Sequence, residues 1–395
     1  MPLSVPGSPL QAPYLPSHFP ENMSGSSAAT PTAFLGWRLK GRSRQARVHL
    51  ALEDVRRHVS ILGATGSGKT TTAATLAFRL WKIGCQVLIL DWHNEYHGMA
   101  EALGGKVISL GLAGSPSINP LDPRLCSDIF THADVVTDIF SEVLAFSAPQ
   151  NYAFINALLD ELEARGYLGS KPDGEPPSLE DILERIRNAP LRSRFDYEIK
   201  VALERRLLPI TFGQAGAAMN GHLQVNIEDI MKGFTVVELG HIRSYSSRRM
   251  LLSVLLKLIN DYCTKREKAP LPHVTILEEA YNVIPPRRIE TPACIGERMI
   301  GELRKFGEAL IIISQLPTQI SQEVIKNSAV RICHSLGTMD DQRLVGGTLG
   351  LEGERLKILS GLRPGEAVLH VSGMLEPYVV YVEPDSIQER ECDER

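Results

Sequence analysis

The sequence lacks the features that mark several large classes of protein. It has no C-x-x-C pair, so its scattered cysteines indicate neither a zinc site nor a disulfide framework. The longest apolar runs, such as MLLSVLLKLI, are shorter than the ~20 residues that a membrane span needs. No cationic and apolar leader opens the chain, so we predict a cytoplasmic protein without a membrane span. We expect core thiols in a reducing compartment at Cys85, Cys126, Cys263, Cys294, Cys333 and Cys392.

An excess of positive charge is also missing. The formal net charge is −4, which argues against a protein that coats nucleic acid by bulk positive charge. A local basic strip inside a ring is still compatible with this charge. The chain does have apolar residues in plenty, because 43% of its 395 residues are hydrophobic. This length predicts two or three structural units of roughly 150 residues each.

Residues 59–72, VSILGATGSGKTTT, contain a full phosphate-binding motif. An apolar run leads into GATGSGKT, which matches G-x-x-x-x-G-K-[ST], and a helix-compatible run follows. Backbone N–H groups of such a loop wrap phosphates, and the helix N-terminus adds its dipole. We predict that Lys69 reaches the β- and γ-phosphates of ATP and that Thr70 ligates Mg²⁺. A glycine-rich turn with a solvated lysine is the alternative interpretation. The predicted nucleotide-binding residues are Gly63, Thr65, Gly66, Ser67, Gly68, Lys69, Thr70 and Thr71.

The rest of the chain alternates apolar β-branched runs with helical periodicity, which predicts an α/β fold with a mostly parallel central sheet. Three segments flank this core and one interrupts it. We expect a disordered Pro/Ser-rich tail at 1–33, with Met1 or Met23 as the true start, a short hairpin at 34–58, the first part of a P-loop core at 59–122, a helical insertion at 123–222, the second part of the core at 223–385 and a charged tail at 386–395.

The expected hairpin alternates apolar and basic residues. Two interpretations stay open for its cations: they contact DNA, or they form a solvated strand face. The cations concerned are Arg38, Lys40, Arg42, Arg44 and Arg47.

Hydrolysis of a phosphate anhydride needs a metal, a carboxylate that orients water and a cation for the charge of the transition state. Glu278 and Glu279 follow the apolar run HVTIL. We predict that Glu278 holds Mg²⁺ beside Thr70 and that Glu279 polarises the attacking water; a pair of surface carboxylates after an edge strand is the alternative. Gln315, after the run ALIIIS, is predicted to hold the water or sense the γ-phosphate, or is a plain turn glutamine.

The cation is predicted to be Arg304, in GELRKFG, acting in a ring as an arginine finger on the neighbouring subunit's nucleotide. Arg298, Arg331 and a purely structural helix-surface arginine are the alternatives. Polar residues after the run CQVLIL lie where open α/β sheets bind ligands, and we expect them to line the nucleotide crevice without an assigned step. These are Asp91, His93 and Glu95.

Several motifs in order carry a family resemblance over 35–385. The motifs GATGSGKTTT, DWHNEYHG, INPLD, ILEEAYNVIP, GELRKFGEALIIISQLPTQI, DDQ and LRPGEAVLH resemble the HerA-like branch of the HerA/FtsK superfamily of DNA-translocating ATPases. The resemblance implies a RecA-like P-loop NTPase core in a hexameric ring, with nucleotide between subunits and double-stranded DNA in the pore. It implies an ATP-dependent DNA translocase or helicase, working in end resection with a NurA-type nuclease or in DNA transfer between cells.

By the same resemblance, Lys69 and Thr70 match the Walker A pair and Gln315 matches the sensor glutamine. Glu278 and Glu279 match the Walker B pair, and Arg304 or Lys305 matches the finger region. The sequence departs from the family in three ways. Glu278 replaces a common Asp, Tyr281 stands where many relatives have His, and the segment 34–58 stands in place of a longer N-terminal β-barrel.

Three other functions are compatible with the motifs. The chain could be a DNA-transfer ATPase without helicase activity, a P-loop switch that regulates a partner, or a structural ring subunit with vestigial hydrolysis. The presence of Lys69, Thr70 and Glu279 counts against the last of these.

Overall fold

The computed structural model describes residues 31–169, 174–221, 223–266, 272–286 and 293–385. The expected charged tail lies outside these residues, as do all but the last three positions of the expected N-terminal tail. Those last positions differ from the expectation, because a strand already begins at Thr32.

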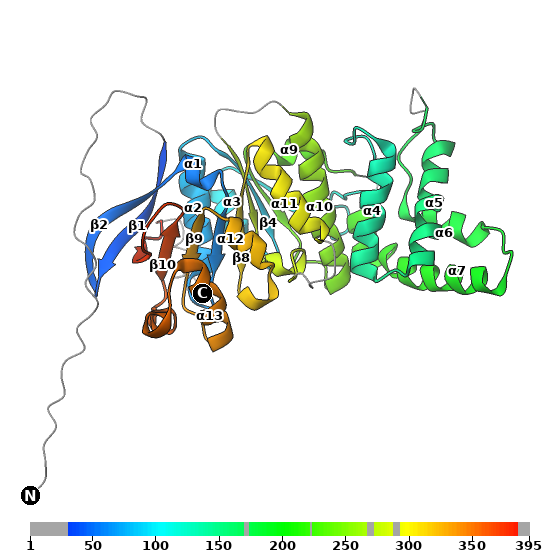
Figure 1. Ribbon diagram of the computed structural model, residues 1–395. Coiled ribbons are helices and arrows are strands. Elements are labelled where there is room, and N and C mark those ends of the chain that lie inside the picture. Colours follow the sequence, from blue (N-terminus) through cyan, green and yellow to red (C-terminus); the bar gives the residue numbers. More distant parts are fainter. Residues whose placement is uncertain (1–30, 170–173, 222, 267–271, 287–292, 386–395) are drawn as a thin grey trace, which may run out of the picture. The chain divides into compact units, whose positions relative to one another are not determined.

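The described residues form one eleven-stranded sheet in the order β2-β1-β11-β10-β9-β3-β8-β7-β4-β6-β5 (Figure 1). From β9 to β5 every neighbouring pair is parallel, and the remaining pairs are antiparallel. The predicted α/β fold with a mostly parallel sheet is therefore confirmed. The strands are β1 (Thr32–Lys40), β2 (Ser43–Ala51), β3 (Val59–Leu62), β4 (Gln86–Asp91), β5 (Lys106–Ser109), β6 (Phe234–Glu238), β7 (His273–Leu277), β8 (Glu308–Ser314), β9 (Val330–Cys333), β10 (Glu366–Val371) and β11 (Tyr378–Val382).

Helices cover both faces of the sheet, which explains why its strands read as continuous apolar runs. The α-helices are α1 (Leu52–Val55), α2 (Lys69–Lys82), α3 (His97–Ala102), α4 (Ile129–Leu144), α5 (Ala148–Ala164), α6 (Leu179–Asn188), α7 (Arg194–Leu207), α8 (Gly213–Met219), α9 (Ile227–Ile230), α10 (Tyr245–Lys265), α11 (Ile295–Leu303), α12 (Gln322–Asn327), α13 (Met339–Leu349) and α14 (Ile358–Gly361). The 3₁₀ helices are η1 (Leu208–Ile210), η2 (Ala280–Asn282), η3 (Arg304–Phe306), η4 (Pro317–Gln319) and η5 (Gly353–Lys357).

The core consists of two hydrophobic clusters. Alternate residues of one strand enter different clusters. Leu88 and Leu90 of β4 belong to the cluster that includes residues of α4, α10 and α11, whereas Val87 and Ile89 belong to the cluster that includes residues of α2. This alternation is the period of two that a strand imposes on its side chains. Among the described residues, none of the helices has the length and apolar character that crossing a membrane requires.

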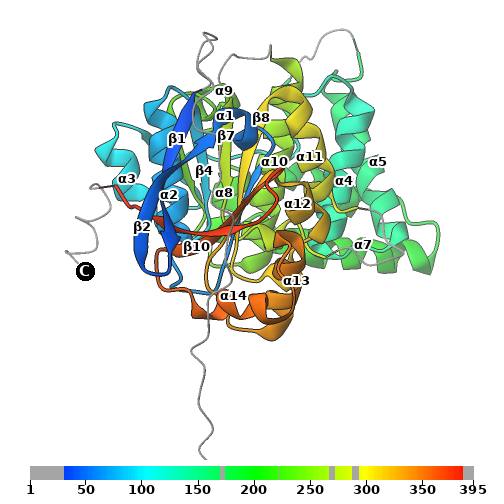
Figure 2. The same cartoon turned by 60° about the vertical axis from the view of Figure 1, so that its left-hand side comes forward.

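The hairpin β1–β2 extends the sheet. Strand β1 pairs with β11, and the two backbones come so close at Gly36 that a Cβ there would clash with the carbonyl oxygen of Tyr381. Figure 2 brings the hairpin to the front, with α2 beside it. The segment preceding β3 is thus an antiparallel extension of the central sheet itself.

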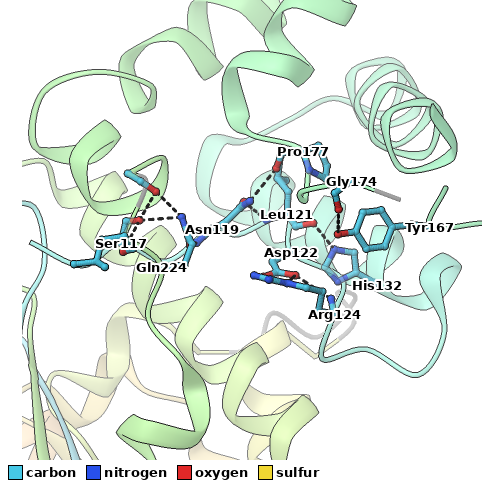
Figure 3. A network of polar contacts seen from close by, with 12 residues as sticks. Ser117, Asn119, Leu121, Asp122, Arg124, His132, Tyr167, Gly174, Pro177 and Gln224 are labelled. Atoms are coloured by element: carbon cyan, nitrogen blue, oxygen red, sulfur yellow. Dashed lines mark hydrogen bonds and ion pairs between the residues drawn. The ribbon is translucent and has the colours of Figure 1, made fainter. Parts of the chain in front are cut away.

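The regular elements among the described residues between 123 and 222 are all helices, and Figure 1 shows α5, α6 and α7 grouped together. The INPLD loop after β5 ties this insertion to the core (Figure 3). The side chain of Asn119 donates to the carbonyl oxygen of Pro177 at 2.9 Å and accepts from the backbone N–H of Leu121 at 2.9 Å. The motif therefore fixes the start of α6 against the loop that leaves the sheet.

His132 of α4 continues this network towards α10. Its Nε2 faces the carbonyl oxygen of Leu121 and therefore donates, so Nδ1 accepts from the buried amine of Lys257 at 2.8 Å. Lys257 in turn donates to Asp261 at 2.6 Å. Burial and the charge of Lys257 lower the pKa of His132 to about 3, which keeps the ring neutral as this donor order requires.

A buried carboxylate organises the N-terminal edge of the parallel strands. Glu308, at the start of β8, accepts from His273 Nδ1 and Thr275 Oγ1, both at 2.7 Å, and from Arg266 Nη2 at 2.9 Å. Burial alone would raise the pKa of Glu308, but the charge and hydrogen bond of His273, with the other two donors, outweigh burial and hold it below its usual value.

We predict that Glu308→Ala lowers the free energy of unfolding by about 3–5 kcal/mol at pH 7, because the side chains of His273, Thr275, Arg266 and Cys263 lose their buried acceptor. The folded-state pKa lies below the unfolded value of ~4.3, so the carboxylate stabilises the fold above that pH. This stabilisation is lost as the pH falls through the folded-state pKa. Urea denaturation of the wild-type and Glu308→Ala proteins between pH 7 and pH 3 measures this effect. The difference between their free energies of unfolding should become smaller as the pH falls. Glu323→Ala, on the exposed face of α12, is the control and should change stability by less than about 0.5 kcal/mol. An equally small effect of Glu308→Ala would contradict the prediction.

Candidate functional site

The carboxyl ends of the central strands are aligned by their register. Leu62 of β3 pairs with Ser314 of β8, and Leu90 of β4 pairs with Leu277 of β7. The residues that follow these strands therefore meet at one edge of the sheet. They include the glycine loop after β3, Asp91 at the end of β4, Glu278 and Glu279 after β7, and Gln315 after β8.

The glycine loop has the backbone shape that its glycines permit. Gly66 and Gly68 have φ values of 74° and 106°, in the left-handed region. A Cβ on Gly68 would also lie 3.1 Å from the backbone nitrogen of Gly365. A Cβ on Gly63 would lie 2.6 Å from Ser67 Oγ. The loop ends at the first residue of α2, so the helix N-terminus points into it.

Two side chains of the glycine loop can donate hydrogen bonds to a bound anion. Ser67 is buried, and its hydroxyl has no hydrogen-bond partner among the described residues. Lys69 is 8% exposed, and its amine donates to the carbonyl oxygen of Ala64 at 2.8 Å. Burial lowers the pKa of Lys69, against the opposing charges of Glu279, Glu278 and Glu95. A triphosphate fits this cradle because it supplies acceptors to both groups. Thr71 lies exposed in the first turn of α2.

Thr70 contacts a carboxylate that sequence reasoning left without a role. Its hydroxyl donates to Glu95 Oε2 at 3.0 Å, whereas we expected Glu278 beside it. The chain reverses just before Glu95 because Asn94 adopts a left-handed φ of 63° and its side chain accepts from the N–H of Gly240 at 2.8 Å. An asparagine in a polar post-strand segment is the sequence signal for this turn.

Glu278 and Asp91 form a buried acidic pair. Asp91 accepts three backbone N–H bonds, from His93, Asn94 and Tyr96. Glu278 Oε2 accepts from the backbone of Trp92 at 3.0 Å and from that of His93 at 3.3 Å. Burial, followed by the charges of Asp91 and Glu95, raises the pKa of Glu278 well above its usual value. The three donors favour charge on Asp91, so Glu278 is the member of the pair that retains the proton.

Glu279 has the geometry of a strained catalytic group. It is 6% exposed and adopts a left-handed φ of 49°, which is costly for a residue with a Cβ. Its Oε1 lies 3.4 Å from His93 Nε2, and its Oε2 is buried without a hydrogen-bond partner among the described residues. The hydrogen bond to Glu279 raises the pKa of His93. A buried carboxylate oxygen without a donor is suited to accept a proton from water.

Gln315 contacts both the glycine loop and the segment that follows Glu279. Its Oε1 accepts from the hydroxyl of Thr65 in the glycine loop at 2.8 Å. Burial and the charge of Glu279 raise the pKa of Tyr281, and the hydrogen bond of Tyr281 with Gln315 opposes this shift. The glutamine therefore lies between the loop and the segment that follows Glu279.

The three candidate finger arginines lie in different surroundings. Arg304 is exposed in η3, four residues before β8. Because β8 has seven residues, more than ~20 Å separates Arg304 from Gln315 and its own glycine loop. Arg298 forms an exposed ion pair with Asp138 at 2.8 Å. Arg331 donates to three backbone carbonyl groups, those of Ile325, Lys326 and Thr348.

The site suits Mg²⁺ only in company with phosphate oxygens. Among the described residues, no group of three or more His, Cys, Asp or Glu side chains is arranged to hold a metal ion. Magnesium usually keeps few protein ligands and takes the rest from waters and nucleotide phosphates. The hydroxyl of Thr70 and the carboxylate of Glu95 provide hard oxygen donors of the required kind, and Glu278 would provide another once a cation displaces its proton.

A glycine loop at a helix N-terminus, two carboxylates after one parallel strand and a glutamine after the next define a P-loop ATPase with a RecA-like core. Residues 34–259 match the family model described as "Helicase HerA, central domain", and the chain belongs to this family. The predicted membership of the HerA/FtsK superfamily is therefore confirmed.

Named relatives and solved structures agree with this assignment. The chain is 23% identical to a DNA double-strand break repair helicase HerA of Saccharolobus solfataricus, with 86% of this chain and 67% of the relative covered. It is 24% identical to a probable HerA of Methanocaldococcus jannaschii, with 83% and 72% covered. The chain thus spans about two thirds to three quarters of these relatives' lengths.

The structural likenesses confirm the RecA-like fold. The structure of VirB4 of Thermoanaerobacter pseudethanolicus superposes with a TM-score of 0.73 at 20% identity, covering 93% of this chain and all of that one. The bacterial conjugative coupling protein TrwB gives a TM-score of 0.58 at 13% identity, with 92% and 97% covered.

We predict that Gly68→Ala weakens ATP binding at least about tenfold, since the Cβ meets backbone at 3.1 Å and the left-handed φ costs ~1–2 kcal/mol. Equilibrium binding of a fluorescent ATP analogue measures this change. Gly301→Ala is the matched control, because Gly301 lies in α11 with nothing within 4 Å of an added Cβ. The control should bind nucleotide normally and be slightly stabilised. Equal affinities for both variants would contradict the prediction.

Proposed function

We propose that this protein is an ATP-dependent motor that translocates or unwinds double-stranded DNA in the cytoplasm, as a homo-oligomeric ring of six subunits. The observation that carries this proposal is the convergence of Lys69, Glu279 and Gln315, from three separate elements, at one edge of the sheet. Membership of the HerA family and the names of its relatives as DNA double-strand break repair helicases support the choice of substrate.

Each residue has a chemical role in hydrolysis. Lys69 and the loop N–H groups bind the β- and γ-phosphates, and Thr70 with Glu95 or Glu278 holds Mg²⁺. The ion supplies positive charge for the phosphate oxygens. Glu279 orients the attacking water and accepts its proton at the oxygen that lacks a donor. Gln315, hydrogen-bonded to Thr65, detects the state of the loop and helps to position the water.

Arg304 acts in trans in this proposal. It lies at the end of β8 opposite to the catalytic edge, too far from its own nucleotide to touch it. An exposed arginine at that edge can reach a nucleotide only if a neighbouring subunit presents its catalytic edge there. The ring arrangement supplies that neighbour.

We predict that Lys69→Ala weakens ATP binding about 10–100-fold, because charge-assisted hydrogen bonds contribute ~1.5–3 kcal/mol. Glu279→Gln should keep wild-type ATP affinity while turnover falls about 10²–10⁴-fold, because the amide cannot accept the proton. Equilibrium binding and phosphate release measure the two effects separately. Full turnover by the Glu279→Gln protein would refute the catalytic assignment.

We predict that Arg304→Ala and Lys69→Ala proteins, each inactive alone, recover part of the ATPase rate when mixed. In a mixed ring an intact Arg304 of a Lys69→Ala subunit faces an intact nucleotide site on the Arg304→Ala subunit. Phosphate release from mixtures at several ratios measures the recovery. The same mixing with Arg298→Ala tests the alternative finger. Absence of recovery in a ring of proven mixed composition would exclude Arg304 as the trans-acting group.

The effect of DNA on the ATPase rate distinguishes a motor from the other proposed functions. We predict that linear duplex DNA raises the ATPase rate several-fold and that the active species, resolved by size, is a hexamer. Equal rates with and without DNA in a monomer would favour a nucleotide switch. Strand separation supports a helicase in end resection with a NurA-type nuclease. Movement along duplex without separation supports a DNA-transfer ATPase.

A further inference from the structure

The hairpin β1–β2 carries a concentration of positive charge that the ATPase site does not use. Residues 32–51 contain five Arg and Lys residues and no Asp or Glu, although the whole chain has a net charge of −4. Three strands separate β1 from β3 in the sheet, which corresponds to about 19 Å from the strand that leads into the glycine loop. The hairpin is therefore a separate surface.

Cross-strand pairing places the cations and aromatic rings of this surface on one face. Trp37 of β1 lies directly opposite Arg47 of β2 on one side and Tyr381 of β11 on the other. Directly opposite residues share a face of a sheet. We call Trp37, Arg44, Arg47 and Tyr381 the hairpin face.

The aromatic rings hold the guanidinium groups in place. Arg44 lies 4.9 Å from the ring centroid of Tyr381, and Arg47 lies 5.4 Å from that of Trp37. Stacking of this kind orients the planar guanidinium without consuming its N–H donors. Arg44 also pairs with Glu383 at 3.1 Å, yet its side chain remains 50% exposed, and Arg47 is exposed. The hairpin face thus presents oriented donors to solvent.

We propose that the hairpin face binds the phosphate backbone of duplex DNA, outside the catalytic edge; this inference rests on the proposed function in its choice of DNA. Oriented guanidinium groups match phosphate oxygens by paired N–H bonds. The arginines lie over the rings, so bases cannot stack there, and contact with the backbone is favoured over contact with unpaired bases. A regular polyanion complements a strand of repeated cations better than a neutral or cationic partner does.

The test is DNA binding by a charge-reversed hairpin face. A fluorescein-labelled 30-base-pair duplex is titrated with the full chain, without nucleotide, and anisotropy is recorded between 50 and 200 mM salt. Arg44→Glu/Arg47→Glu should weaken binding at least about tenfold and reduce the slope of log affinity against log salt by about 2, since each lost phosphate contact contributes ~0.9. The ATPase rate without DNA should be unchanged.

Two controls make the result specific. Arg44→Lys/Arg47→Lys keeps the charge and should keep the salt slope, which also shows that substitution at these positions leaves the fold intact. Arg194→Glu/Arg343→Glu changes charge equally at exposed positions on α7 and α13 and should bind nearly as wild type. An unchanged slope for the charge-reversed hairpin, or an equal loss in the α7/α13 control, overturns the proposal.

Competitors separate DNA from other anions. Unlabelled duplex should displace the probe at lower charge concentration than poly-glutamate, whereas equal displacement would mean that an acidic protein fits as well and would overturn the assignment to DNA.

The outcome is independent of the motor function. If the wild-type ATPase ignores DNA while the hairpin variants lose DNA binding, the motor fails and the hairpin site stands. If DNA stimulates the ATPase while the protein with the charge-reversed hairpin binds DNA normally, the hairpin site fails and the motor function stands.

Discussion

The register of the parallel strands is the constraint on which the site depends. Each site residue follows the end of a strand, and the pairing of Leu62 with Ser314 and of Leu90 with Leu277 brings these ends together. A slip by one residue would turn every side chain of a strand to the other face. The two hydrophobic clusters oppose such a slip, because the central strands bury alternate residues in different clusters. Core packing thus sets the geometry of the catalytic edge.

The buried carboxylates at the two edges of the parallel sheet have pKa values that are shifted in opposite directions. Glu308 accepts from four side-chain donors, those of His273, Thr275, Arg266 and Cys263, and its pKa lies below the usual value. Glu278 receives two backbone donors and faces other carboxylates, and burial with their charge raises its pKa. The N-terminal edge is therefore electrostatically complete and structural. Among the described residues at the catalytic edge, the buried acids Asp91, Glu278 and Glu279 outnumber the buried amine of Lys69, which is the condition that favours a bound cation.

Local motifs made much of this site predictable. The glycine loop, Lys69 and the strand-end positions of Glu279 and Gln315 follow from short patterns whose meaning does not depend on distant residues. The contact between Thr70 and Glu95 was not predicted, because it depends on the left-handed turn at Asn94. The place of the hairpin beside β11 was equally hidden, since it joins residues more than three hundred positions apart. Non-local pairing and rare backbone conformations have no short signature.

The pairing of the hairpin with β11 affects the position of the glycine loop through α2. At its C-terminal end, Arg79 donates to the backbone carbonyl groups of Phe34, Leu35 and Glu383. Near its N-terminus, Thr72 is hydrogen-bonded to His334 at 2.9 Å, and His334 Nδ1 lies 2.9 Å from the carbonyl oxygen of Glu366.

Because a carbonyl oxygen only accepts, Nδ1 of His334 donates and Nε2 accepts from the hydroxyl of Thr72. Burial and the charge of Lys69 lower the pKa of His334 to about 4, so the ring stays neutral and keeps this order of donors. The helix that presents Lys69 is thus held at one end by the hairpin and β11 and at the other by the strand pair β9–β10. The antiparallel part of the sheet, which contributes no catalytic group, fixes the position of the phosphate-binding helix.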